Sequence, residues 1–383
     1  MDFVCLKDDL VRGVRLASYA LGTRSSMPIL AGLKMEINGD LLRLQATDLE
    51  RAVRCELPIE NGAGDEAVVL NGAVFNQIAS HLPADDKISL KTEAEDGTTV
   101  KVRCGEASFD LPTLPLEDYP EIATLPNTKI ASVKAAHFHR GLEQTAFAAL
   151  RAGETTRLNL TGVNLVLKGE HLKMVATNGY RLAVKTIEVD EIHEEGEYLI
   201  EASVLTDLDR VLSQVGEPAV DFYRGEGQLF FQAGGVTFMA RTIAEDFPDF
   251  ERVIPKDNPI ALGFDRRALL EALQRIDITA AEDSGAITLR AISEESAVQI
   301  NSSSKDKGRA EERVRLKKVP TESVDISFRG EYIVDALKRL DSDEIAVWLA
   351  APEKAGLIEP SGEKIAEGDQ GFLYVCMPVR LST

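Results

Sequence analysis

The residues of this chain that could carry chemistry are few, and their spacing suits no common reaction. His137 and His139 are two residues apart in a stretch with helical periodicity, where such side chains point in different directions and make poor joint metal ligands. Gly225-Glu226-Gly227 lacks the third glycine of a dinucleotide fingerprint and precedes a strand-like stretch, which predicts a hairpin turn. The cysteines fit no Cys-x-x-Cys pattern and are expected to be reduced and mostly buried: Cys5, Cys55, Cys104 and Cys376.

The sequence contains neither a phosphate-binding GxxxxGK[ST] loop nor a GxSxG nucleophile elbow. We therefore expect no catalytic residue, no metal site and no cofactor. An enzyme whose site is assembled from scattered residues remains an alternative. It would require a compact set of nucleophile, base and orienting group, and the sequence offers none.

Length and composition describe an ordinary globular chain of two or three domains. It has 383 residues, of which 44% are hydrophobic and 28% charged. No apolar run approaches the ~20 residues of a membrane span, and the acidic N-terminal stretch is unlike a signal peptide. These features predict a cytoplasmic protein without a membrane partner. The net charge of −20, taken alone, argues against a nucleic-acid partner.

The elements that would position any site form an internal repeat. Six short amphipathic helices are expected, beginning near residues 7, 71, 134, 201, 265 and 329. Each has one apolar anchor near its start, at successive spacings of 65, 63, 67, 64 and 64 residues: Leu10, Phe75, Phe138, Leu205, Leu269 and Ile333. So steady a period predicts a supersecondary unit that occurs six times.

Between the helices the hydrophobic pattern changes to period two, which predicts antiparallel strands at 42–47, 87–104 and 219–243. The stretch 87–104 is expected to turn at Asp96-Gly97. Each repeat is therefore interpreted as one helix followed by several strands, an α+β unit. A repeat of about 64 residues is small for a domain. Pairing the repeats, with proline-rich joins, predicts three similar domains at 1–124, 125–256 and 257–383.

Charge is distributed unevenly between helices and strands. The six helix windows hold 13 basic and 12 acidic residues, so the acidic excess lies outside them. Basic side chains at positions 2, 5 and 6 after the anchor should lie opposite the apolar face. Two interpretations stay open: an ordinary mixed solvated face, or a shared helical surface that faces a polyanion without reading its sequence.

Several motifs in their order along the chain resemble the bacterial DNA polymerase III beta subunit family, the sliding clamps. The similar segments are LGTRSSMPILAGLKMEINGD, LQATDLE, SFDLPTLPLEDYP, RLNLTGV, VATNGYRLAV, AEDFPDFERVIPK and LYVCMPVRL, and together they span the whole chain. The resemblance implies a non-catalytic processivity factor with the DNA clamp fold. Two chains would join head to tail, Phe109 of one meeting Ile278 and Thr279 of the other, in a ring around duplex DNA.

The resemblance also implies two further surfaces. The DNA-facing residues would be Arg24, Arg15, Arg140, Arg151, Arg210, Arg275, Lys338 and Arg339. A pocket between the second and third domains would bind short peptides of the replicative polymerase subunit, the clamp loader and other proteins with a clamp-binding motif. Its walls would be Leu160, Thr177, Gly179, Arg181, Leu182, Pro248, Val253, Met377, Pro378, Val379 and Arg380, with Met377 to Leu381 as its floor.

Two other interpretations remain open. One is a clamp paralogue that serves repair or drug tolerance. The other is an acidic scaffold without a DNA function, which predicts no retention on circular DNA.

Overall fold

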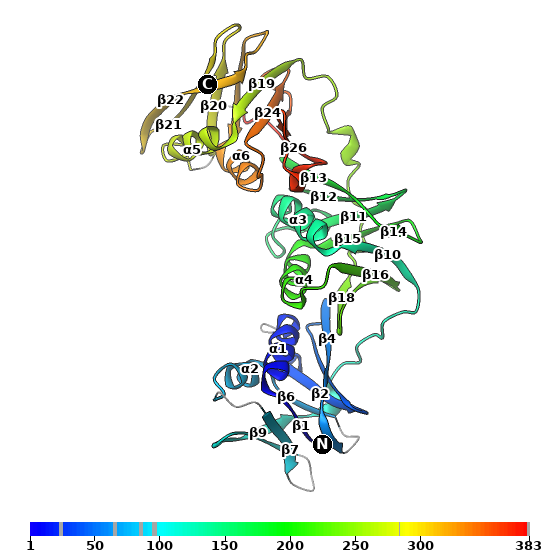
Figure 1. Ribbon diagram of the computed structural model, residues 1–383. Helices are drawn as coiled ribbons and strands as arrows, with labels where there is room; N and C mark the ends of the chain where they lie inside the picture. Colours follow the sequence, from blue (N-terminus) through cyan, green and yellow to red (C-terminus); the bar gives the residue numbers. More distant parts are fainter. Residues whose placement is uncertain (23–25, 64–66, 84–86, 94–97, 283, 381–383) are drawn as a thin grey trace. The chain divides into compact units, whose positions relative to one another are not determined.

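The structure is a computed structural model that describes residues 1–22, 26–63, 67–83, 87–93, 98–282 and 284–380. Its contacts divide the chain into two compact units, each built from two segments. The first unit holds Met1–Ala135 and Val204–Thr242, and the second holds Ala136–Ser203 and Ile243–Thr383. Figure 1 labels the elements of both.

The repeat predicted from the sequence is present six times, with one addition. A strand precedes each helix, so the unit is strand, helix and three strands, whereas the sequence pattern predicted a helix followed by strands. The first two repeats are β1 (Asp2–Leu6), α1 (Lys7–Ala17), β2 (Gly32–Asn38), β3 (Leu41–Thr47), β4 (Arg51–Pro58), then β6 (Val68–Asn71), α2 (Gly72–Ser80), β7 (Lys87–Glu93), β8 (Thr99–Cys104) and β9 (Ala107–Leu114).

The third and fourth repeats make up the middle of the chain. They are β10 (Lys129–Lys134), α3 (Ala135–Thr145), β11 (Gly162–Lys168), β12 (His171–Thr177), β13 (Arg181–Glu188), then β15 (Gly196–Glu201), α4 (Ala202–Val215), β16 (Ala219–Gly225), β17 (Gln228–Ala233) and β18 (Val236–Arg241).

The last two repeats follow the same order. They are β19 (Ile260–Asp265), α5 (Arg266–Asp277), β20 (Ala286–Ala291), β21 (Ala297–Ser304), β22 (Gly308–Lys318), then β23 (Val324–Arg329), α6 (Gly330–Leu337), β24 (Glu344–Leu349), β25 (Gly356–Ser361) and β26 (Phe372–Cys376). Two short strands, β5 (Glu60–Ala63) and β14 (Glu191–Ile192), stand outside the pattern.

The helices form where the hydrophobic period predicted them. All six anchors are at most 3% exposed, so each helix buries the face that carries its anchor. Asn71 and Asp265 cap α2 and α5, because their side-chain oxygens accept hydrogen bonds from the backbone N–H groups of Val74 and Ala268. In α3 an added Cβ at Gly141 would meet the end of the Met174 side chain, which would have to move.

The third strands of the repeats join successive domains. In the first unit the strand order is β10-β16-β17-β18-β4-β3-β2-β6-β9-β8-β7-β1-β5, and β4 pairs antiparallel with β18. In the second unit the order is β15-β11-β12-β13-β26-β25-β24-β19-β22-β21-β20-β23, and β13 pairs antiparallel with β26. In both pairs, the last strand of one domain's first repeat meets the last strand of the next domain's second repeat.

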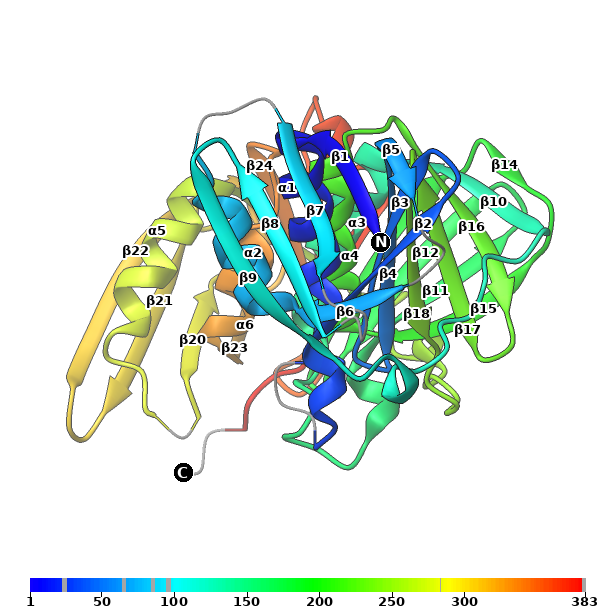
Figure 2. The ribbon, with the colours of Figure 1, turned by 90° about the horizontal axis from the view of Figure 1, so that it is seen from below.

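Three helices lie together in each unit (Figure 1). In the first, α1 packs on α2 and Arg12 of α1 donates to the carbonyls of Gln214 and Val215 at the end of α4. In the second, α5 packs on α6 and Arg140 of α3 donates to the carbonyl of Arg339 just after α6. Figure 2 shows α5 against β21 and β22, and β7, β8 and β9 side by side.

Several smaller predictions can also be compared with the structure. Residues 225–227 form the turn between β16 and β17, and Gly227 has φ +64°. The turn expected at Asp96-Gly97 lies outside the described residues. The four cysteines are buried and none is in a disulfide within the described residues, and burial raises the pKa of Cys5, Cys55 and Cys376 to about 12. Among the helices that the structure describes, none has the length and apolar character to cross a bilayer.

Candidate functional site

Four segments of the second unit meet at the predicted peptide pocket. The turn at Leu158–Leu160 is tied to the loop after β18, because Asn159 donates its backbone N–H to Glu245 and its side-chain amide to the carbonyl of Asp246. Leu182 on β13 pairs in register with Val375 on β26. The chain end is joined to the same place, since the backbone N–H of Met377 donates to the carbonyl of Tyr180 at 2.8 Å.

An apolar cluster lies under these segments. Val175, Leu182, Val184 and Val375 are buried, and Phe247, Phe250 and Ile254 of the loop after β18 pack against them. Val253 and Met377 stand at the surface nearby, 51% and 41% exposed. We call this surface the docking patch. Exposed apolar side chains beside a buried apolar cluster are suited to bind large apolar side chains of a partner.

The predicted wall residues differ in their exposure. Leu160 and Leu182 are buried and support the patch from below. Thr177, Arg181, Pro378 and Val379 are half-buried, and the exposed residues are Gly179, Pro248, Val253, Met377 and Arg380. Leu381, the last residue of the expected floor, lies outside the described residues.

A five-residue turn between β12 and β13 carries the edge of the docking patch. The hydroxyl of Thr177 donates to the carbonyl of Arg181 at 2.6 Å and accepts the backbone N–H of Gly179 at 3.0 Å. The side-chain oxygen of Asn178 accepts the backbone N–H groups of Tyr180 and Arg181. Gly179 has φ +88°, a conformation that favours glycine, and no atom lies within 4 Å of the place where its Cβ would be.

Arg181, one of the predicted wall residues, directs its guanidinium inward. Its guanidinium donates to Asp335 at 2.8 Å and to the carbonyl of Phe147 at 2.6 Å, and it lies 4.5 Å from the ring centroid of Tyr332. The side chain is only 11% exposed. Since its donors are directed inward, Arg181 holds β13 against α6 and is a poor candidate to bind polar groups of a partner at the rim. Arg380 is exposed, so its guanidinium is accessible to polar groups of a partner.

The predicted DNA-facing residues fall into three groups. Arg15 and Lys338 are exposed, and their side chains make no ion pair with any residue that the structure describes. Arg151, Arg210 and Arg275 are exposed but paired with Glu154, Asp207 and Glu312. Arg339 is partly covered, with its guanidinium 4.0 Å from the ring centroid of Phe147. Arg24 lies outside the described residues.

Arg140, one of the predicted DNA-facing residues, is largely covered by its own chain. Its side chain is 16% exposed and pairs with Asp369 at 2.8 Å, while Asp369 is fully buried. The helical period placed Arg140 opposite the apolar face of α3, but the segment after β25 covers that position. The position on the helix relative to the apolar anchor therefore did not distinguish Arg140 from exposed arginines such as Arg15.

The sequence reasoning missed the network around Asp369. This carboxylate accepts hydrogen bonds from the side chains of Arg140 and Gln144 and from the backbone N–H groups of Asp341 and Ser342. These donors hold the pKa of Asp369 below its usual range, although burial opposes them. Lys185 donates to the carbonyls of Gly368 and Gln370, and burial lowers its pKa to about 8. The only sequence signal was an acidic stretch at 350–371, without a period to place it.

The expected dimer residues lie at strand edges and helix ends. Phe109 is half-buried in β9. Ile278 follows α5 and is 69% exposed, whereas Thr279 beside it hydrogen-bonds to Ser302. An exposed large apolar side chain such as that of Ile278 would gain free energy from burial, and its contact with a partner stays a prediction.

These features define an α+β clamp fold: six repeats in three similar domains, joined by shared sheets, with a docking patch for apolar groups. Within the described residues, no cluster of His, Cys, Asp or Glu side chains is arranged to hold a metal ion.

Comparison with known proteins identifies the family. Models of the DNA polymerase III beta subunit match the chain in three parts: the N-terminal domain at residues 1–123, the central domain at 132–249 and the C-terminal domain at 251–380. The chain belongs to the DNA polymerase III beta subunit family.

Relatives and solved structures agree with this family over the full length. The chain is 27% identical to the beta sliding clamp of Staphylococcus aureus strain Mu50 over 387 aligned residues, which cover 99% of both chains. It is similar to the DNA polymerase III beta subunit of Thermotoga maritima, with 27% identity and a TM-score of 0.89. It is also similar to the DNA polymerase sliding clamp of Bacillus subtilis, with 26% identity and a TM-score of 0.90. Each covers 100% of both chains.

Proposed function

We propose that this protein is a replication processivity factor: a sliding clamp that encircles duplex DNA as a homodimer and tethers the replicative polymerase. It performs no catalysis of its own. A closed ring stays on DNA because of its topology, so its contacts with the backbone can be weak and independent of sequence. This role supports a cytoplasmic location at the replication fork.

The observation that carries the proposal is the pairing of third strands. β4 pairs with β18, and β13 pairs with β26, by one common rule. By the same rule, β22, the last strand of the first repeat in the last domain, would pair with β9, the last strand of the second repeat in the first domain. Along most of their length each strand is paired on one side only within the described chain: β9 meets β6 at two residues, and β22 meets β19 near Leu316 and Lys318.

An exposed strand edge invites pairing with another chain. If β22 of one copy pairs with β9 of a second, each copy keeps one complementary edge, and we propose that two chains close into a ring. Phe109 lies in β9 and Ile278 follows α5, which packs on β22. Phe109 therefore lies on one of the two strands, and Ile278 follows the helix that packs on the other.

The docking patch supports the second part of the proposal. Its apolar cluster, its exposed Val253 and Met377 and its open edge at Gly179 suit a short peptide with one or two large apolar side chains. Methionine adapts its shape to different partners, which suits one patch that serves several proteins. We propose that the replicative polymerase, the clamp loader and other proteins with such motifs bind here in turn.

One experiment tests the topological claim directly. The protein is loaded onto nicked circular DNA by a clamp loader, isolated with the DNA, and the circle is then cut. We expect release on linearisation, and light scattering of the free protein at micromolar concentration at twice the chain mass of 41.8 kDa. Retention that is unaffected by cutting the circle, or a strict monomer with and without DNA, would contradict a sliding clamp.

A further inference from the structure

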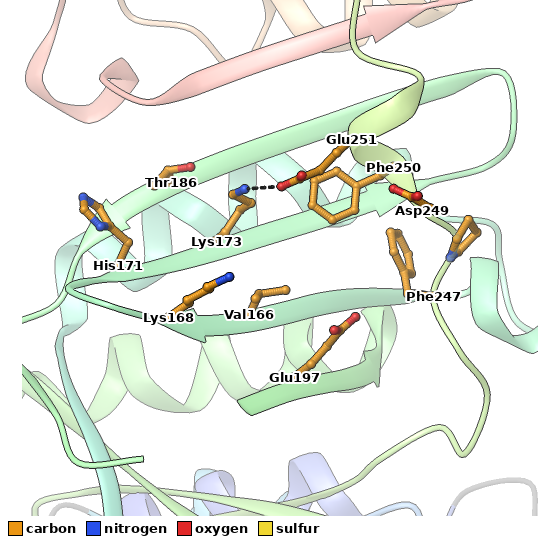
Figure 3. A pocket seen from close by; sticks show the side chains of 11 residues that line it. Val166, Lys168, His171, Lys173, Thr186, Glu197, Phe247, Asp249, Phe250 and Glu251 are labelled. Carbon is orange, nitrogen blue, oxygen red and sulfur yellow. Dashed lines mark hydrogen bonds and ion pairs between the residues drawn. The ribbon is translucent and has the colours of Figure 1, made fainter. Parts of the chain in front are cut away.

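A groove lies on one face of the strands β11, β12 and β13, beside the loop that follows β18 (Figure 3). Its volume is about 560 Å³, within the range of roughly 300–1,000 Å³ that is common for ligand sites. Val166, Phe247 and Phe250 give it an apolar middle. Neither the expected wall residues, apart from Pro248, nor the DNA-facing set includes the residues that line it.

The groove continues from the docking patch. Phe247 and Phe250 pack against the cluster of Leu182 and Val375 under the patch, and both also line the groove. Pro248, which stands between them, is a wall residue of the predicted peptide pocket as well as of the groove. The docking patch and the groove therefore share the residues of the loop after β18.

Within the described chain, some polar and charged side chains along the groove have a hydrogen-bond or ion-pair partner and others do not. Lys173 donates to Glu251 at 3.0 Å, Asp249 pairs with Arg252 at 2.6 Å, and Glu197 accepts from Asn164 at 2.6 Å. Lys168 and His171, at the turn between β11 and β12, are exposed, and their side chains make no hydrogen bond or ion pair with any described residue. The groove thus ends at an exposed ammonium group, that of Lys168, and an exposed imidazole, that of His171.

We propose that this groove is a second binding subsite, which takes an acidic segment beside the docking motif of the same partner peptide. An apolar side chain of that segment lies over Val166 and Phe250, and a carboxylate binds at Lys168 and His171. This inference rests on the proposed docking function and adds to it a preference for the residues that flank the motif.

The lining favours a peptide over nucleic acid. Three carboxylates, those of Glu197, Asp249 and Glu251, line the same groove as Lys168 and would repel a continuous run of phosphates. A peptide with a single acidic residue can place that residue beside Lys168. Only its uncharged backbone would then lie near the three carboxylates. Its gain should be modest, because exposed ion pairs contribute little and are screened by salt.

The test compares three fluorescent peptides on the full-length protein at low salt: a docking motif alone, the motif extended by an apolar and an acidic residue, and the motif extended by an apolar residue and lysine. Extensions are made at either end. We expect one acidic extension to tighten binding by about three- to tenfold. Lys168→Glu should abolish that gain, leave the short motif unchanged and favour the lysine extension. Lys364→Glu, an exposed substitution of equal charge outside the groove, should behave as the natural protein.

The outcomes separate this inference from the function on which it rests. If the short motif binds but no acidic extension improves it, the subsite is wrong and the docking patch stands. If no peptide with the motif binds, the docking function is contradicted. If Lys168→Glu weakens retention on circular DNA and changes no peptide affinity, the basic end serves DNA and the peptide subsite is overturned.

Discussion

Leu49 and Gly179 occupy the same position in two copies of one turn. In Thr47–Arg51, the threonine hydroxyl donates to the carbonyl of Arg51 at 2.7 Å and accepts the backbone N–H of Leu49 at 3.0 Å, as happens at Thr177–Arg181. Leu49 has φ +77° and Gly179 has φ +88°. The turn therefore accepts a side chain at this position. At Thr177–Arg181 the glycine leaves that side-chain position empty.

This comparison gives a prediction for Gly179→Leu. The side chain should stand at the edge of the docking patch and lower the affinity for a docking peptide by about tenfold or more, because the patch loses access for a large apolar group. The conformational cost should be about 1–2 kcal/mol, as expected for a non-glycine residue in this region. Peptide titration and thermal melts measure both. Gly179→Ala is the control, and equal weakening by alanine would assign the effect to the backbone.

Asp369 gives a second prediction at the residue scale. It is fully buried and accepts four donors, so Asp369→Asn removes the charge that satisfies Arg140 and Gln144. We expect a loss of about 3 kcal/mol in the free energy of unfolding, measured with urea. Asp341→Asn is the matched control, because Asp341 also pairs with Arg140 but is 68% exposed. It should cost less than about 1 kcal/mol. Equal costs would show that burial of Asp369 is unimportant.

The lowered pKa of Lys185 predicts a pH dependence. In the folded chain this amine loses its proton near pH 8, whereas in the unfolded chain it keeps it to about 10.5. The unfolded state binds more protons between these values, so this group makes stability rise with pH there. Lys185→Met should remove that rise, which is at most about 3 kcal/mol. Urea unfolding at pH 7.5 and 10 measures it, with Lys364→Met as control. An unchanged difference between the two pH values would contradict it.

At the scale of elements, the sequence predicted what depends on local periodicity. The six helices, the hairpin at 225–227 and several strands were expected because an amphipathic pattern is written in adjacent residues. Apart from SVDISFRG at 323–330, whose pattern is strand-like, the strands before the helices were missed, since a short buried run such as 129–134 lacks a clear alternation. The pairing of β4 with β18 joins residues far apart in the chain, which no local pattern can specify.

The site was predicted in part for the same reason. Apolar wall residues such as Leu182 and Met377 come from the family resemblance, and their role in binding stays a prediction. The inward direction of Arg181 and Arg140 depends on Asp335 and Asp369, which come from distant helices and loops. Arg12 and Arg140 share one repeat position and both donate to carbonyls at the end of a neighbouring helix, a regularity visible only in the structure.

The free edges of β9 and β22 lead to a prediction for Ile278→Asp. This side chain is 69% exposed in the single chain, so the substitution should leave the melting temperature of the monomer unchanged. Burying a charge at the proposed interface should weaken the dimer by about tenfold or more. Light scattering over a dilution series measures this. Ile292→Asp, at a 44% exposed position in a loop, is the control. An unchanged dimer would place the interface elsewhere.

At the scale of the whole molecule, the acidic net charge and DNA binding are compatible if few cations face the duplex. Arg15 and Lys338 are the exposed, unpaired members of the predicted set within the described chain. Reversing both to Glu should weaken DNA binding and lower the slope of log affinity against log salt by about two. Lys354→Glu with Lys364→Glu is the control of equal charge. Equal effects of the two pairs of substitutions would indicate that the overall charge of the chain, and no defined surface, governs DNA binding.

The shared sheet between β4 and β18 also has a consequence for synthesis on the ribosome. β4 ends at Pro58, and its partner is complete only at Arg241, so a nascent chain carries an open strand edge while the intervening residues are made. At ~5–20 residues per second that interval lasts roughly 10 to 40 s. Arg51 and Arg54 place charge along this unpaired edge of β4. Such charge discourages strands of other chains from pairing with it. Translation speed between these strands should therefore influence how much of the chain escapes aggregation.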